Sequence, residues 1–141
     1  MRLSEYTDCT LRVLMYCAEH RDRRVTIAEI AEFHGASKSL LMKIVNDLAR
    51  QGVLETVRGR GGGLRLLPRP EEVRIGDIVR AAETDFRLVE CFDRAANTCR
   101  LDGRCGLKRV LNQALNAWLT TLNGATLADI VAAPRASSRP A

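Results

Sequence analysis

The stretch over residues 53–68, VLETVRGRGGGLRLLP, constrains the fold more than any other part of this 141-residue chain. Apolar and polar residues alternate on both sides of RGRGGG, which is the pattern of a β-hairpin with a glycine-rich tip. Glycine lets the backbone come close to another surface, and Arg58 and Arg60 add positive charge at the tip. The alternative is a solvated hairpin with incidental arginines.

Two short amphipathic helices are predicted immediately before this hairpin. The first, in TIAEIAEFHG, begins with a capping box formed by Thr26 and Glu29, and Gly35 ends it. Its predicted apolar side consists of Ile27, Ile30, Ala31 and Phe33. The second, in SKSLLMKIVNDLARQG, has Ser37 as its N-cap and is closed by Gly52. Its apolar stripe is Leu41, Ile44, Val45 and Leu48, and its outer face is Lys38, Ser39, Met42, Lys43 and Asn46.

Two helices joined by a short turn with glycine, the second with a polar and basic outer face, are typical of a helix-turn-helix. Two packed helices that bind nothing are the alternative. The basic hairpin favours the first interpretation, because a hairpin in this position is a wing. We therefore expect a mainly α-helical fold with a small β-hairpin wing, a winged helix-turn-helix over residues 1–70. An amphipathic helix over residues 2–19 opens it.

Residues 71–133 are expected to form a second unit with a short helix in RIGDIVRAAE and a long one in CGLKRVLNQALNAWLTTLNG. A helix that is apolar on two sides must be buried on two sides, so the long helix predicts a homodimer. The alternative is the central core helix of a monomer. Its apolar positions are Leu107, Val110, Leu111, Ala114, Leu115, Trp118, Leu119 and Leu122. Thr126 and Asp129 predict a capped last short helix, and residues 134–141 a disordered tail.

The distribution of charge favours a polyanionic partner for the N-terminal half. Residues 1–70 carry 12 Lys and Arg against 8 Asp and Glu, and residues 58–69 contain four arginines and no acid. Double-stranded DNA is the expected partner. The sequence contains no nucleophile–base motif, no phosphate loop with lysine and no paired carboxylates on a shared face, so an enzyme is not expected. No apolar run approaches a membrane span and the N-terminus lacks a signal h-region, so a cytoplasmic protein is expected.

Three of the five cysteines, Cys91, Cys99 and Cys105, lie on one short polar loop between two predicted helices. Their gaps match no zinc knuckle, no common ferredoxin motif and no C-x-x-C redox pair. Cys105 lies near the start of the long helix, where the helix dipole and the free backbone N–H groups favour negative charge. Three arginines of the loop add positive charge. A metal or cluster site of open identity is predicted, and unligated surface cysteines are the alternative.

Together these segments resemble the Rrf2 family of winged-helix transcription regulators over about residues 1–132. The resemblance is carried by MRLSEYTDCTLRVLMY, VRGRGGGLRL, IGDIVRAAE, the three-cysteine loop and LNGATLADIV. It is closest to the nitric-oxide-sensing branch of the family, whose members are dimeric repressors with a 4Fe–4S cluster. It implies that nitrosylation of the cluster releases the protein from its operator and derepresses nitric-oxide detoxification genes.

The resemblance also implies a ligand set. Cys91, Cys99 and Cys105 would bind the cluster, and Asp8 would be the fourth ligand, reaching across from the partner subunit. The branch that regulates iron–sulfur cluster assembly places a histidine just after the third cysteine, where this chain has CGLKR. That difference, together with Asp8, favours the nitric-oxide sensor. Cys9, which adjoins Asp8, is a less favoured fourth ligand.

We hypothesise that the helix from Ser37 enters the major groove of a palindromic operator. Its N-terminal residues Ser37, Lys38 and Ser39 would contact phosphates and base edges, with Lys43 further along. Arg58 and Arg60 of the wing would reach a narrow, A·T-rich minor groove. The two half-sites of the palindrome would lie about 34 Å apart.

Two other assignments stay open. The same fold would serve a 2Fe–2S regulator of iron–sulfur cluster assembly, or a thiol redox switch without a cluster. A zinc-stabilised interaction module that binds no nucleic acid belongs to a different class. The type of cluster distinguishes the 2Fe–2S regulator and the thiol switch from the nitric-oxide sensor. Affinity for DNA distinguishes the zinc-stabilised module from all of them.

Overall fold

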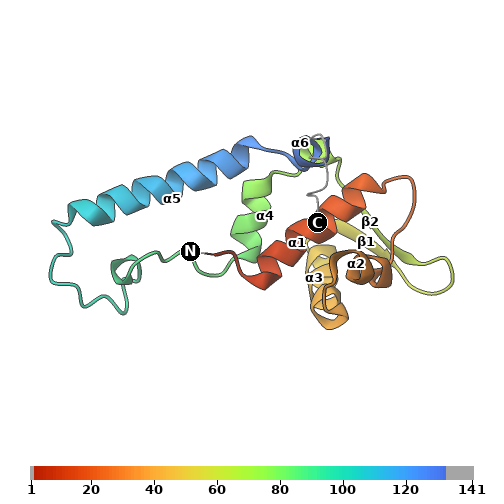
Figure 1. The fold of residues 1–141 in the computed structure, drawn as a ribbon, viewed down its shortest axis with the longest axis horizontal. Coiled ribbons are helices and arrows are strands. Elements are labelled where there is room, and N and C mark those ends of the chain that lie inside the picture. The colour runs from red at the N-terminus through yellow and green to blue at the C-terminus, as the bar shows by residue number, and fades with distance from the viewer. Residues whose placement is uncertain (1, 133–141) are drawn as a thin grey trace, which may run out of the picture.

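The computed structural model describes residues 2–132 and consists of a body at one end and an arm that projects from it (Figure 1). The N-terminal half of the chain supplies three helices and an antiparallel hairpin to the body, and a further helix, α4 (Ile75–Ala82), joins the body to the arm. These elements are α1 (Glu5–Glu19), α2 (Ile27–His34), α3 (Lys38–Arg50), β1 (Leu54–Val57) and β2 (Gly63–Leu66). The predicted tail, residues 134–141, lies outside the described residues.

The first helix begins at Glu5, so the predicted start at residue 2 is wrong. The reason is local, because the Ser4 hydroxyl accepts a hydrogen bond from the Thr7 backbone N–H at 3.2 Å and makes Ser4 the N-cap. The inner side of α1 is fully buried at Val13 and Leu14. This helix therefore forms the centre of the body, in contact with α2, α3 and β2.

The predicted helix-turn-helix is present. Thr26 and Glu29 form both bonds of the capping box, and Gly35 ends α2 in the left-handed conformation with φ of 62°. Phe33 was expected on the apolar side of α2, but it is 66% exposed. At about 100° per residue, Phe33 falls outside the stripe that Ile30 and Ala31 bury, and its ring lies against the edge of His34.

The second helix of the motif, α3, also differs from its prediction in one detail. Ser37 occupies the N-cap position, but its side chain makes no capping hydrogen bond, since its hydroxyl pairs with that of Ser39 at 2.8 Å. The inward stripe is buried as predicted, at Leu41, Ile44, Val45 and Leu48.

The hairpin pairs Leu54 with Leu66 and Val57 with Gly63. Its three leucines, Leu54, Leu64 and Leu66, are all buried against the body. An isolated bridge from Val25 to Leu64 adds a third backbone segment. At Gly63, φ is 141° and a Cβ atom would lie 2.5 Å from the Val25 carbonyl oxygen. Only glycine allows the wing to approach the segment before α2 this closely.

The C-terminal half leaves the body and returns to it. Its elements are η1 (Pro70–Glu72), α4 (Ile75–Ala82), η2 (Glu90–Phe92), α5 (Gly106–Gly124) and α6 (Leu127–Ala132). The predicted cap of α6 is confirmed by hydrogen bonds between Thr126 and Asp129. The Leu127 backbone N–H donates to Val73 at 2.8 Å, and the Leu127 side chain is fully buried. The last helix is therefore anchored in the body against α1.

The arm consists of α5 and the cysteine loop, which runs back beneath it (Figure 1). Its attachment is a close contact between α4 and the end of α5, where a Cβ atom on Gly76 would lie 2.0 Å from the Asn123 side-chain oxygen. No helix among residues 2–132 is long and apolar enough to cross a membrane.

Candidate functional site

The outward face of α3 is exposed and carries the residues predicted to contact DNA. Lys38, Ser39 and Lys43 are all exposed, and Ser37 is exposed at the start of the helix. Because Leu41, Ile44, Val45 and Leu48 bury the opposite side, this face is presented to solvent by the packing of the helix.

A network beside this face joins α3 to α1. The Tyr6 hydroxyl donates a hydrogen bond of 2.6 Å to Asp47, and the Lys43 ammonium lies 5.4 Å from the centre of the Tyr6 ring. Burial and the neighbouring Asp47 carboxylate raise the pKa of Tyr6 to about 12. The hydrogen bond from Tyr6 and the ion pair with Arg50 lower the pKa of Asp47. The charge of Asp47, the acidic residue of α3, is thus compensated by Arg50.

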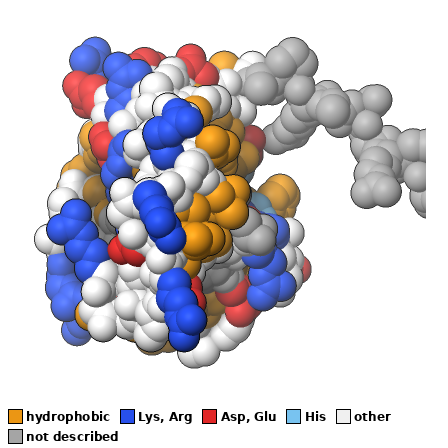
Figure 2. Space-filling view, turned by 90° about the vertical axis from the view of Figure 1, so that its left-hand side faces the viewer, with side chains coloured by type: hydrophobic (Ala, Val, Ile, Leu, Met, Phe, Trp, Pro, Cys, Tyr) orange, Lys and Arg blue, Asp and Glu red, His pale blue; other side chains and the backbone are white. Residues whose placement is uncertain are grey.

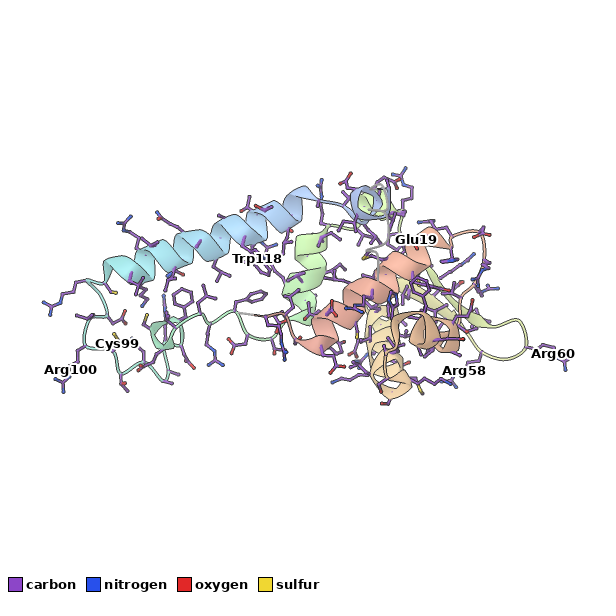
Figure 3. The ribbon with its side chains drawn as sticks, in the orientation of Figure 1. Glu19, Arg58, Arg60, Cys99, Arg100 and Trp118 are labelled. Atoms are coloured by element: carbon purple, nitrogen blue, oxygen red, sulfur yellow. The ribbon has the colours of Figure 1, made fainter. Side chains whose placement is uncertain are left out.

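The wing presents two arginines at its tip. Arg58 and Arg60 point away from the body (Figure 3), and neither forms an ion pair with any residue from 2 to 132. Glu55 of β1 instead pairs with Arg65 of β2 at 2.7 Å and with Arg24, in the segment before α2, at 3.6 Å. The uncompensated positive charge of the wing is therefore concentrated at its tip.

The three cysteines of the loop differ in exposure. Cys91, in η2, is buried, whereas Cys99 and Cys105 are partly exposed. Cys105 is the N-cap residue of α5, which confirms its predicted position at the start of the long helix. Figure 3 shows Cys99 and Arg100 at the end of the arm furthest from the wing. The cysteine loop and the tip of the wing thus lie at opposite ends of the elongated molecule.

The loop is held by hydrogen bonds of its own. Glu90 accepts bonds from the Thr98 backbone N–H and hydroxyl at 2.7 and 2.6 Å, which lower the pKa of its carboxyl. Asp102 accepts bonds from Asn97 at 2.6 Å and from Lys108 at 2.5 Å. Arg87 pairs with two carboxylates, Asp85 and Asp93. The aspartates of the loop therefore have partners, whereas its cysteine thiols form no disulfide.

The structure does not gather the three sulfur atoms into a ligand set. Within the described range, no three His, Cys, Asp or Glu side chains lie close enough to hold a metal ion. The donor set nevertheless fits an iron–sulfur cluster, because thiolates are its usual ligands. An open hollow of about 900 Å³ lies beside Cys105. Positive charge from Arg94, Arg104 and Arg109 would balance the thiolates there, whereas Lys108 is paired with Asp102.

The remaining candidate ligands lie in α1, away from the loop. The Asp8 side chain is 50% exposed and forms an ion pair of 2.8 Å with Arg12. Cys9 and Cys17 are buried, and burial raises the pKa of both thiols, that of Cys17 to about 12. Cys17 is accordingly a small apolar core residue. Asp8 does not join the cysteines of its own chain.

Part of the apolar surface of α5 is exposed to solvent. No residue of α5 is buried, and Leu107 and Val110 are 63% and 51% exposed. Trp118, on the side facing the loop, packs against Phe86 with ring centres 6.4 Å apart. Figure 2 shows the arm end-on, with a patch of hydrophobic side chains bordered by Lys and Arg.

Sequence reasoning missed Glu83, which ties the start of the loop to α1. Its carboxylate accepts hydrogen bonds from the Ser4 backbone N–H and the Thr7 hydroxyl, each at 2.9 Å. These bonds lower the pKa of Glu83. The partners lie 79 and 76 residues away in sequence. The sequence offers no signal for such a contact.

Comparison with known proteins places this architecture among transcription regulators. The Rrf2 family model, described as an iron-dependent transcriptional regulator, matches residues 3–133. The HTH-type transcriptional regulator NsrR of Bacillus subtilis is 48% identical over 93% of this chain and 90% of that protein. Protein aau3 of Rhizobium meliloti is 44% identical over 94% of this chain and 86% of that protein.

Two solved structures have the same fold. IscR of T. potens aligns with a TM-score of 0.77 and 23% identity, covering 100% of this chain and 94% of that one. CymR, the global cysteine regulator of B. subtilis, aligns with a TM-score of 0.77 and 24% identity, covering 95% and 98%. The expected winged-helix fold is confirmed by these neighbours and by the hairpin of the chain itself.

Proposed function

The chain belongs to the Rrf2 family of transcriptional regulators, and from that premise we propose that it is a nitric-oxide-responsive repressor. As a homodimer it binds a palindromic operator, and it leaves the DNA when nitric oxide reacts with an iron–sulfur cluster held by the cysteine loop. The observation that carries the proposal is the joining, in one chain, of a basic winged helix to a loop with three thiols. Relatives named as transcriptional regulators also agree with the expectation that the chain is not an enzyme.

In this proposal α3 enters the major groove and the wing reaches the neighbouring minor groove. Ser37, Lys38 and Ser39 contact phosphates and base edges at the start of the helix. Lys43, which lies over the Tyr6 ring, serves as a phosphate contact. Arg58 and Arg60 are free of ion pairs among the described residues, so no internal bond has to break before they enter an A·T-rich minor groove.

Cys91, Cys99 and Cys105 would hold a 4Fe–4S cluster together with Asp8 of the partner subunit. One iron of the cluster would be bound by the Asp8 carboxylate, which is a weaker ligand for iron than a thiolate. Nitric oxide could attack the cluster at that iron. The basic side chains around Cys105 support this assignment because they offset the charge of the thiolates. Half-exposed Asp8 supports it too, because its carboxylate is accessible from outside its own chain.

The dimer would form through α5. Exposed Leu107 and Val110 extend the apolar surface of this helix beyond the side that packs on the loop. A second α5 placed there would bury both residues and bring the two cysteine loops toward the partner body. This arrangement is required if Asp8 is to reach the loop of the other subunit.

The first experiment is the native mass of anaerobically purified protein compared with its denatured mass. A dimer with one 4Fe–4S unit per chain supports the proposal. A 2Fe–2S unit would instead indicate a regulator of iron–sulfur cluster assembly. A dimer without added mass would favour a thiol switch, and bound zinc without affinity for DNA would favour an interaction module.

Two variants test the ligand assignment. Asp8→Ala should change the visible absorption of the loaded protein and speed its reaction with nitric oxide, whereas Asp22→Ala, at an exposed aspartate in the turn after α1, should do neither. Cys99→Ser should abolish loading, and buried Cys17→Ala should retain it. Full loading of Cys99→Ser would refute the ligand set.

A further inference from the structure

A methionine lies in the middle of the outward face of α3, between polar neighbours. Met42 is 54% exposed, and the residues beside it on this face are Ser39, Lys43 and Asn46. The buried stripe of the helix is complete without it, since Leu41, Ile44, Val45 and Leu48 already face the core. The packing of the body therefore gives no reason for an apolar side chain here.

Asn46 lies one turn further along the same face, and it is exposed. Its amide makes no hydrogen bond with any of residues 2–132, whereas its neighbours Lys43 and Asp47 are engaged with Tyr6. The amide therefore keeps both its donor and its acceptor for a ligand outside the chain. Met42 therefore places an apolar group, and Asn46 an amide, next to each other on a helix face that is otherwise polar and basic.

The major groove of DNA offers one partner for each group. The C5-methyl of thymine is its only apolar feature, and an Asn amide matches the N6 donor and N7 acceptor of adenine. Four residues of helix rise about 6 Å. Successive bases of one strand lie about 3.4 Å apart along the axis. Met42 and Asn46 can therefore meet bases that are no more than two base pairs apart.

We infer that Met42 and Asn46 are the sequence-reading pair of α3. Met42 packs against a thymine methyl, and Asn46 forms two hydrogen bonds with an adenine within two base pairs of it. The inference rests on the proposed operator binding, but it does not depend on the cluster or on nitric oxide. Lys43 and the wing arginines contact phosphate or the minor groove, and they add affinity with little information about the major groove.

The test removes single groups from the DNA and from the protein. The preferred operator is first selected from random duplexes with the full-length wild-type protein. Each thymine in turn is then replaced by deoxyuridine, which lacks the methyl group, and each adenine by 7-deazaadenine, which lacks N7. Affinities of wild type, Met42→Ala and Asn46→Ala are measured for every duplex by fluorescence anisotropy.

At one thymine per half-site, deoxyuridine should weaken the wild type about fourfold, the effect of one buried methyl group. The same replacement should leave Met42→Ala unchanged. At one adenine no more than two base pairs away, 7-deazaadenine should weaken the wild type about fivefold or more and leave Asn46→Ala unchanged. Met42→Ala raises helix propensity at an exposed site, so loss of folding is not expected.

Leu67→Ala serves as the control, because Leu67 is 48% exposed and lies outside α3. It should show the same dependence on thymine methyl groups as the wild type. If every deoxyuridine effect persists in Met42→Ala, the methionine does not read the operator and the inference is wrong. If the wild type selects no sequence at all, the proposed function fails first, and the inference fails with it.

Discussion

Replacing Glu83 by alanine should destabilise the chain strongly, although the residue lies in no predicted motif. The variant loses two hydrogen bonds to a charged acceptor, from the Ser4 backbone N–H and from the Thr7 hydroxyl. Bonds to charged groups contribute about 1.5–3 kcal/mol each. Thr7 is fully buried but keeps the Ser4 hydroxyl at 2.9 Å, so no buried donor is left without a partner. We expect a loss of about 3–4 kcal/mol in the free energy of unfolding.

The measurement is urea unfolding followed by circular dichroism, with Glu83→Gln and Glu32→Ala alongside. Glutamine keeps an acceptor oxygen without the charge, so it should cost about 1 kcal/mol. Glu32 is exposed and forms no bond or ion pair within the described chain, so its replacement should change stability by less than about 0.5 kcal/mol. A loss below about 1 kcal/mol for Glu83→Ala would refute the reasoning.

The stability difference between wild type and Glu83→Ala should also decrease as the pH falls. The hydrogen bond from Ser4 is the main cause that lowers the pKa of Glu83 in the folded chain. The stabilisation is therefore complete above the unfolded pKa of about 4.3, and it is lost as the pH falls through the lower folded value. The difference between wild type and Glu83→Ala should narrow below about pH 4. A difference that stays constant down to pH 3 would show that the carboxylate charge is not responsible.

Three further predictions concern the DNA interface, the wing and the arm. If four basic groups of each protomer meet phosphates, the slope of log K against log salt should be about −7. Arg60→Ala should reduce its magnitude by about 2, and an unchanged slope in anisotropy titrations would remove Arg60 from the site. Gly63→Ala should cost about 2 kcal/mol or more in thermal unfolding because its Cβ meets the Val25 carbonyl, whereas Gly124→Ala, with open space around it, should not. Val110→Asp should give a monomer in light scattering; a variant that stays dimeric would exclude this face of α5 as the interface.

Local signals predicted most of the helix and strand positions. The capping boxes at Thr26 and Thr126 and the alternation around RGRGGG depend on residues a few positions apart, and the structure contains all three features. The errors are local too. Ser4 competes successfully for the Thr7 N–H and shortens α1, and Ser37 bonds to Ser39 rather than capping α3. Periodicity ranks possible helix ends, but it does not decide between competing hydrogen bonds.

The candidate site could be predicted only in part, because some of its contacts join segments that are far apart in the sequence. The exposure of Lys38, Ser39 and Arg60 follows from periodicity and from the hairpin, so it was accessible from the sequence. The tie from Glu83 to α1 depends on tertiary packing between distant segments. The described residues do not bring the three cysteines together. Neither their spacing nor the fold of the single chain therefore specifies how they would approach a shared ligand.

The contact between Gly76 and Asn123 gives the arm the mechanics of a lever with its fulcrum at the body. From Asn123 to Gly106, where α5 meets the cysteine loop, the helix is about 25 Å long, and α6 holds the other end through buried Leu127. A shift of about 4 Å at the cysteine loop therefore reaches α4 as a rotation of about 10°. A side chain larger than hydrogen at position 76 would meet Asn123 and displace this contact without touching a cysteine or a predicted DNA contact.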